Sequence, residues 1–357
     1  MLPLGLTETS VVHSFDARGV DGLASDKKTA VVDLFSGSED QELAMFDEAN
    51  NSSWVAQTEV PGGLSVDFIQ LVSAGGEFYG AWLNLSSSAE IWERISLSGK
   101  VTTPKMPLRS TITWGFPYGN ATRLFAAAPG FLVELNASSL KVVANYSAPI
   151  PTNVAILSAA PSGNRLYLGG YRLLSNNATN PYFGYLTLSS RKLTTITNSI
   201  TPYPSTYLAA FYSVAAQGSS IYVGGDIEVF ALYNTTIAYH TAQGLLYRFT
   251  PSDSTFQNMS SELPLQSWGV WSIVPWSKTI AFTIAGWGYN SSTRVSYVGD
   301  GIYSLSSSGS SLVNQSSLLP SSFFGGGFDA TASSDGWFFI GGYDPQPYAP
   351  QVVAIKT

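Results

Sequence analysis

The chain has 357 residues, of which 45% are hydrophobic and only 11% are charged, and it carries a net charge of −7 and no cysteine. The lack of cysteine excludes disulfide bonds, thiolate metal sites and cysteine nucleophiles, and the negative charge argues against nucleic acid as a partner. No apolar run approaches the roughly 18 residues of a membrane-spanning helix. The first residues, MLPLGLTETS, do not read as a signal peptide, which also fits a mature chain whose leader has been removed.

A strand-like segment recurs seven times along the chain, each time after a short apolar stretch and a turn. The anchors lie at Val31, Phe78, Leu124, Leu166, Ile221, Ile280 and Trp337. Neighbouring anchors are 42 to 59 residues apart, and no helical periodicity is sustained between them. A period of roughly 40 to 50 residues with four short strands in each unit is typical of a β-propeller. Long single-sheet repeats and an array of immunoglobulin-type sandwiches are the rival folds, but a sandwich needs a period of about 100 residues.

We therefore predict an all-β protein with one domain, residues 1–357, folded as a seven-bladed β-propeller. The predicted blades are residues 18–62, 63–108, 109–150, 151–205, 206–265, 266–322, and 323–357 together with 10–17. The last segment ends one strand short, at QVVAIKT, and a spare strand, SVVHSFDA, precedes the first. We expect this N-terminal strand to close the last blade, because closure removes open sheet edges.

Pairs of glycines follow three of the anchors, at Gly169–Gly170, Gly224–Gly225 and Gly341–Gly342. We expect each strand to end at its pair, close to neighbouring backbone, with glycine supplying the positive φ needed to leave the strand. A strand that ends in two glycines and is followed by two large side chains six residues apart resembles the kelch family of β-propellers. Six residues separate Phe249 from Phe256 and Leu186 from Leu193, although the second pair is aliphatic. The resemblance implies architecture and not activity, since propellers host many functions.

Asn-x-Ser/Thr sequons are strongly enriched. They are expected as glycosylation sites at Asn50, Asn51, Asn84, Asn120, Asn136, Asn145, Asn177, Asn234, Asn258, Asn290 and Asn314. These are 11 of the 16 asparagines, whereas chance would give about three or four. The enrichment predicts a secreted, N-glycosylated protein, and the alternative is that Asn and Ser share turns.

Three carboxylates are candidates for a ligand or cation site at one mouth of the propeller channel. Counting back from the anchors places Asp21, Asp67 and Asp329 on neighbouring inner strands, in line with Ser158, Ser213 and Ser272. Three such carboxylates could hold a hard cation or work as an acid–base pair. The alternative is that each caps a turn and contacts water. The two histidines, His13 and His240, are too far apart in the repeat to suggest a shared site.

Aromatic residues gather in the later repeats. Trp268, Trp271, Trp276 and Trp287 are candidates for contacting a partner or stacking on sugars. Core packing is the alternative explanation for most of them.

The sequence thus favours a secreted or cell-surface binding or structural module, in a surface layer or another extracellular assembly. The partners expected are extracellular proteins, glycans or copies of the chain itself, and N-linked glycans are the only bound groups expected. The alternative is an extracellular hydrolase or lyase that uses the carboxylates at the channel mouth.

Overall fold

Thirty β-strands and two short 3-10 turns build the part of the chain that the structure describes. The computed structural model describes residues 9–14, 19–26, 29–35, 41–47, 52–56, 66–84, 89–103, 116–120, 123–128, 130–175, 178–197, 207–233, 236–264, 267, 269–276, 279–285, 287–290, 295–298, 301–306, 309, 311–319, 330–332, 337–343 and 350–356. No helix in these ranges is long and apolar enough to cross a membrane.

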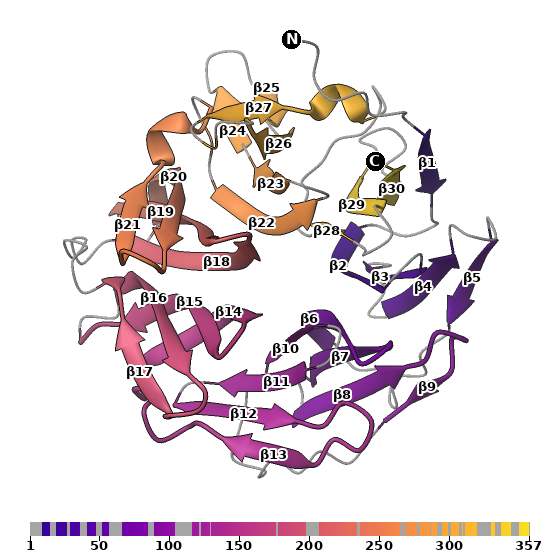
Figure 1. The fold of residues 1–357 in the computed structure, drawn as a ribbon. Helices are drawn as coiled ribbons and strands as arrows, with labels where there is room; N and C mark the ends of the chain where they lie inside the picture. The colour runs from indigo at the N-terminus through magenta and orange to yellow at the C-terminus, as the bar shows by residue number, and fades with distance from the viewer. Residues whose placement is uncertain are drawn as a thin grey trace.

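The strands form seven four-stranded antiparallel sheets arranged around a ring (Figure 1). Sheet 1 contains β2 (Gly19–Asp26), β3 (Thr29–Phe35), β4 (Gln41–Asp47) and β5 (Ser52–Ala56). Sheet 2 contains β6 (Val66–Ala74), β7 (Glu77–Asn84), β8 (Ala89–Ile95) and β9 (Val101–Thr102). Sheet 3 contains β10 (Phe116–Asn120), β11 (Arg123–Ala128), β12 (Phe131–Leu135) and β13 (Val142–Asn145).

Sheet 4 contains β14 (Val154–Ser162), β15 (Arg165–Leu173), β16 (Thr179–Thr187) and β17 (Lys192–Thr195). Sheet 5 contains β18 (Tyr207–Gln217), β19 (Ser220–Tyr233), β20 (Thr236–Thr250) and β21 (Thr255–Asn258). Sheet 6 contains β22 (Gly269–Trp276), β23 (Thr279–Ala285), β26 (Gly301–Leu305) and β27 (Leu312–Asn314), and the ribbon β24 (Trp287–Asn290) and β25 (Val295–Val298) is inserted before β26. The 3-10 turns η2 (Ser260–Glu262) and η3 (Ser316–Leu318) follow β21 and β27.

Sheet 7 joins the two ends of the chain. Its order is β1 (Thr9–Ser14), β30 (Pro350–Lys356), β29 (Trp337–Tyr343) and β28 (Ala330–Ala332). The register pairs Thr9 with Lys356 and Ser14 with Gln351. The N-terminal strand therefore pairs with the C-terminal strand, as the sequence predicts.

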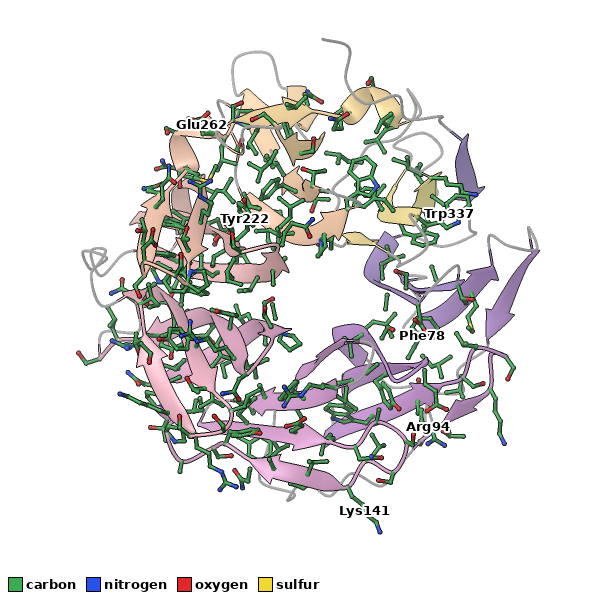
Figure 2. The ribbon with its side chains drawn as sticks, viewed as in Figure 1. Phe78, Arg94, Lys141, Tyr222, Glu262 and Trp337 are labelled. Carbon is green, nitrogen blue, oxygen red and sulfur yellow. The ribbon has the colours of Figure 1, made fainter. Side chains whose placement is uncertain are left out.

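The hydrophobic core lies between neighbouring sheets and not inside any one of them. One cluster joins Phe125 and Leu132 of sheet 3 to Leu166 and Tyr182 of sheet 4, and similar clusters join sheets 2 and 3, 4 and 5, 5 and 6, and 6 and 7. The second strands β11 and β15 are buried on both faces over most of their length, which explains their continuous apolar runs. Phe78 and Tyr222 sit in this interior, whereas Lys141 points away from the ring at its rim (Figure 2).

The glycine pairs lie inside strands and not at strand ends. β15 continues past Gly169 and Gly170, and neither glycine has a positive φ. A Cβ on Gly170 would lie 1.9 Å from the carbonyl oxygen of Ala155 in the adjacent inner strand. A Cβ on Gly169 would lie 2.5 Å from Val214 of the next sheet. The predicted close approach is therefore confirmed, and the predicted strand ends and positive φ values are wrong.

The spacing of large side chains reflects a hairpin that recurs between the third and fourth strands. Phe249 pairs directly with Phe256, and Leu186 pairs directly with Leu193. In sheets 4 and 5 the residue just before the fourth strand has a positive φ: Arg191 at 54° and Ser254 at 59°. Each hairpin thus places two apolar side chains opposite each other on one face, which is the basic stabilising unit of a sheet.

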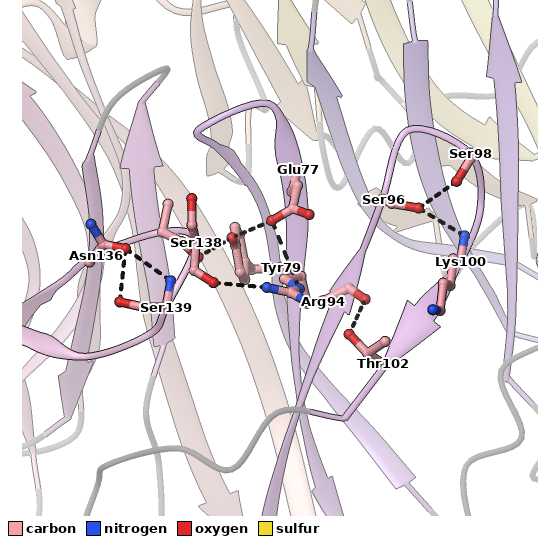
Figure 3. A network of polar contacts seen from close by, with 11 residues as sticks. Glu77, Tyr79, Arg94, Ser96, Ser98, Lys100, Thr102, Asn136, Ser138 and Ser139 are labelled. Atoms are coloured by element: carbon pink, nitrogen blue, oxygen red, sulfur yellow. Dashed lines mark hydrogen bonds and ion pairs between the residues drawn. The ribbon is translucent and has the colours of Figure 1, made fainter.

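Such hairpins also fasten one sheet to the next, as Figure 3 shows for sheets 2 and 3. The hydroxyl of Tyr79 donates to the carbonyl of Ala137 and lies 3.1 Å from Glu77 Oε2. Arg94 Nη1 donates to the carbonyl of Ser138 over 2.9 Å. Burial, followed by the charge of Glu77, raises the pKa of Tyr79, so its hydroxyl stays protonated as a donor.

We expect Tyr79→Phe to destabilise the protein by about 1 to 2 kcal/mol, because the carbonyl of Ala137 loses its donor from sheet 2. Urea unfolding measures the change. Ser98→Ala is the control, since it removes an exposed hydroxyl whose one hydrogen bond within the described residues is to Ser96 in the same turn, and we expect it to cost less than about 0.5 kcal/mol. Equal effects of the two substitutions would show that the hairpin contact does not fasten the sheets.

Candidate functional site

The inner strands β2, β6, β10, β14, β18, β22 and β28 lie nearest the centre of the ring (Figure 1). Five of them contain a β-bulge, an extra residue that their partner strand does not match. The bulge residues are Asp21, Ile69, Leu157, Tyr212 and Trp271. The bulges define a common level around the ring against which the predicted site residues can be placed.

Two of the three candidate carboxylates, Asp21 and Asp67, do not share one level. Asp21 is itself the bulge residue of β2, and Asp67 comes two residues before the bulge residue of β6. Asp329 lies outside the described residues. Counting back from the anchors ignored the bulges, so the alignment of Asp21 with Asp67 is wrong by two strand positions, which is about 7 Å along a strand. No group of three or more His, Asp or Glu side chains in the described part of the chain could hold a metal ion.

The serines after the bulges connect neighbouring inner strands. Ser158 Oγ accepts a hydrogen bond from the backbone N–H of Val214 over 2.9 Å. Ser213 Oγ accepts one from the N–H of Ile273 over 2.8 Å. These serines satisfy main-chain donors of the next inner strand, so they fasten sheet 4 to sheet 5 and sheet 5 to sheet 6.

Two of the predicted aromatic residues occupy different environments. Trp276 is buried and stacks on Phe338 with the ring centroids 4.8 Å apart, so it is a core residue and is not available to a partner. Trp271 is half-buried and stacks on Tyr212, with centroids 5.0 Å apart and an interplanar angle of 15°. Trp268 lies outside the described residues, and Trp287 belongs to β24. The stack of Tyr212 on Trp271 joins two bulge residues on adjacent inner strands.

A buried carboxyl that the sequence analysis missed lies beside this stack. Asp226 directly follows the second glycine pair, pairs with Ala210 of β18, and is 1% exposed. Its side chain is hydrogen-bonded to Tyr212. Burial, followed by the negative charge of Glu228, raises the pKa of Asp226 to about 8. Burial, followed by the negative charge of Asp226, raises the pKa of Tyr212.

The position of Asp226 is apolar or aromatic in other sheets. The register places Tyr171, Ala285, Leu83 and Phe35 at the equivalent site, one residue beyond the pair opposite the bulge. A single acidic residue among these apolar positions was the available signal in the sequence. Two carboxyls of the same strand with different environments can serve as an acid–base pair, but a side chain that is 1% exposed cannot touch a substrate in this conformation.

The exposed fraction is described for four of the sequon asparagines, and three of these four share a repeated turn. Asn136, Asn145, Asn258 and Asn314 are all exposed. In Asn145, Asn258 and Asn314, at the ends of β13, β21 and β27, the side-chain oxygen accepts the N–H of the Ser two residues later. The Ser147 and Ser260 hydroxyls then bond to the backbone of the third strand, at Leu132 and Leu246.

Sheet 4 makes the same turn without asparagine. Thr195 occupies the position of Asn145, and Thr197 bonds to both backbone groups of Phe183 as the serines do in the other sheets. Part of the sequon enrichment therefore has a structural cause, since Asn-x-Ser is one of the sequences that can form the exit turn of a sheet.

The two faces of the ring differ. One face carries the connections between first and second strands and the hairpins between third and fourth strands, and we call it the short-turn face. The connections between first and second strands have two residues in sheets 2, 4 and 5. The opposite, long-loop face carries the connections between second and third strands. These include residues 286–300 with the ribbon β24–β25, and the end of the β19–β20 hairpin, whose pairing continues to Tyr233 and Thr236 beyond the start of β18.

Comparison with known proteins supports the fold. No family model matches the chain, and no curated protein matches it. A streptogramin B lyase structure matches at 15% identity and TM-score 0.57, covering 97% of this chain and 98% of that one. Similarity at this identity shows a β-propeller fold and nothing about activity.

Two further structures match only in part of their own length. The extracellular domain of a protein assigned as a one component system from B. thetaiotaomicron has 12% identity and TM-score 0.59, and the match covers 97% of this chain and 39% of that one. A prolyl endopeptidase structure has 9% identity and TM-score 0.52, and the match covers 96% of this chain and 51% of that one. The matched proteins have different activities, so the fold alone does not choose among them.

Proposed function

We propose that each of the seven sheets is one blade of a seven-bladed, kelch-like propeller, and that the chain is a secreted or cell-surface, N-glycosylated binding module. The observation that carries the proposal is the difference between the two faces. The short-turn face is held together by contacts between sheets, such as those of Tyr79 and Arg94. The long-loop face carries the ribbon β24–β25 and the projecting β19–β20 hairpin. Loops that rise from a rigid scaffold are where binding residues concentrate.

The partners that suit this face are extracellular proteins, glycans or further copies of the chain in a surface layer or similar assembly. Only 41 of the 357 residues are charged, so there is little electrostatic repulsion to keep copies apart. The alternative hydrolase or lyase depends on Asp21, Asp67 and Asp329. The register does not align the first two, and the buried carboxyl of Asp226 is closed to substrate.

Light scattering of the purified chain across a concentration series tests the proposal, with a second copy of the chain as the probe. We expect the mass to rise with concentration, and we expect replacement of the ribbon β24–β25 by a two-residue turn to abolish the rise. The matched control is Ser98→Ala and Lys100→Ala on the short-turn face, which should leave the association unchanged. A folded chain that stays monomeric at all concentrations would exclude self-association as its mode of binding.

Glycosylation can be separated from the structural role of the sequons. Asp can accept the same Ser N–H as Asn but cannot carry an N-glycan, whereas Ala can do neither. We expect Asn145→Asp, Asn258→Asp and Asn314→Asp to keep the stability of the unglycosylated fold while each removes one glycan mass from protein secreted by a eukaryotic host. The corresponding Ala variants should lose the same mass and, in addition, about 1 kcal/mol of stability each.

Intact-mass measurement and urea unfolding provide the two readouts. If the wild-type protein secreted by its native source has the mass of the bare chain, the glycoprotein proposal is wrong and the exit turn alone explains these three sequons.

A further inference from the structure

Asp226 lies between two sheets, and each neighbouring element approaches its carboxyl closely. β18 contributes Tyr212, the hydroxyl hydrogen-bonded to the carboxyl. β22 of sheet 6 contributes Gly269, where an added Cβ would lie 3.3 Å from Asp226 Oδ2 and 3.1 Å from Trp271 Nε1. β20 opposes Asp226 with Gly244, which has no side chain to offer. The carboxyl is therefore enclosed where the inner strands of sheets 5 and 6 meet.

Each ionisable group described near Asp226 either carries a negative charge, which disfavours ionisation of Asp226, or is uncharged. Glu228, two residues along the same strand, is a second carboxyl whose charge disfavours ionisation of Asp226. Tyr212 is an uncharged phenol, and Tyr171 of β15 lies near Tyr212. From β22 the neighbours are Gly269 and Trp271, and neither can titrate. No cation contributes to the electrostatics of Asp226 among the described residues.

The carboxyl is also incompletely satisfied. Its Oδ1 is buried and has no hydrogen-bond partner in the described part of the chain. An ionised carboxylate enclosed in this way, with one oxygen unpartnered and a second carboxylate nearby, is costly, whereas a protonated carboxyl is far less so.

We propose that Asp226 is a proton-held latch between sheets 5 and 6: protonated, it lets β22 pack against β18 and β19, and its ionisation loosens this contact on the long-loop face. The pKa raised to about 8 agrees with this enclosure. The device would couple the part of the ring that carries the β19–β20 hairpin to the pH of the surroundings. The inference does not depend on the binding function proposed above.

The direction of the pH effect follows from the raised pKa. The folded protein holds the Asp226 proton more tightly than the unfolded chain, whose pKa is near the ordinary 3.8. The stability that this proton contributes is therefore complete below about pH 4 and is lost as the pH rises through about 8.

Thermal unfolding from pH 5 to pH 9 tests the latch on Asp226→Asn, which has nearly the same shape and cannot ionise. We expect the midpoint of the wild type to fall by about 5 °C more than that of Asp226→Asn over this range. Asp253→Asn is the matched control, because Asp253 is exposed in a turn and its pKa is lowered, so it stays ionised throughout. Identical pH profiles for the wild type and Asp226→Asn would overturn the proposal.

Hydrogen exchange locates the effect. Above pH 8, after correction for intrinsic exchange rates, we expect faster exchange at the amide of Ile273, which bonds to Ser213 between sheets 5 and 6, than at the amide of Val214, which bonds to Ser158 between sheets 4 and 5. Acceleration spread evenly over all sheets would contradict a local latch. If Asp226→Asn does not fold, Glu228→Gln serves instead. It removes the second-largest cause of the raised pKa and should move the wild-type transition to lower pH, and an unmoved transition would also overturn the proposal.

Discussion

Gly225→Ala is expected to leave little folded protein. The added Cβ would lie 1.9 Å from the carbonyl oxygen of Ala210 and 2.8 Å from the Cα of Phe211, and both are backbone atoms of the inner strand of the same sheet. The bulge between Phe211 and Ser213 fixes this backbone, and Ser213 ties it in turn to Ile273 of the next sheet. The clash cannot be relieved by moving a flexible side chain, so we expect a loss of about 3 kcal/mol or more.

Gly218→Ala is the control that separates close approach from backbone conformation. Gly218 has a φ of +58° and no atom within 4 Å of a built Cβ, so substitution costs only the strain of a left-handed alanine, about 1 kcal/mol. Gly170→Ala should repeat the large effect, because its Cβ would lie 1.9 Å from the carbonyl of Ala155. Soluble yield and urea unfolding of the three variants measure the difference. If Gly225→Ala were as stable as Gly218→Ala, close approach would not be the reason for the glycine pair.

The glycine pairs also show what sequence reasoning could and could not supply. Their recurrence revealed the repeat, and the all-β propeller fold that it predicted is confirmed. The conformation was wrong, because a pair of glycines in sequence indicates a turn as readily as a crowded strand. The packing distinguishes the two: Gly170 lies against the backbone of Ala155 in the adjacent strand, and Gly169 lies against Val214 of another sheet.

The hairpin spacing was a reliable signal because it is local. Six intervening residues place Phe249 opposite Phe256, and the turn between them sets that register. Seven residues separate Phe46 from Trp54, one more than separate Phe249 from Phe256. There Trp54 pairs with Met45 instead of Phe46. Short-range pairing can therefore be counted from the sequence, to within one residue.

The site could not be counted in the same way. Each bulge adds a residue to an inner strand without leaving a mark in the sequence, so Asp21 and Asp67 were aligned although they stand at different levels. Asp226 was overlooked because Gly-Gly-Asp looks like an exposed turn, and only the enclosure by β18 and β22 makes its carboxyl unusual. Long-range packing, which decides burial, has no local signature.

Deletion of residues 1–17 is expected to have the other large effect, because it removes β1. All six residues of β1 pair with β30, from Thr9 opposite Lys356 to Ser14 opposite Gln351. Without β1, sheet 7 loses its outer strand and β30 becomes an exposed edge, which is a template for pairing with other chains. We expect a loss of about 3 to 6 kcal/mol, counting about 1 kcal/mol for each backbone hydrogen bond lost, together with aggregation.

The control is deletion of residues 1–8, which end just before β1 and should leave the thermal midpoint unchanged. Rescue makes the test specific: a synthetic peptide of residues 9–17 supplied in excess should pair with β30, raise the midpoint of the truncated protein and suppress its aggregation. A peptide with His13 and Val11 replaced by proline should not rescue, since proline cannot donate to the strand ladder. A truncated protein that stays soluble, unfolds at the wild-type midpoint and ignores the peptide would show that sheet 7 does not need the N-terminal strand. In that case the pairing of Thr9–Ser14 with β30 would contribute little to stability, and the contacts of β2 with β28, β29 and β30 would be enough to join sheet 7 to sheet 1.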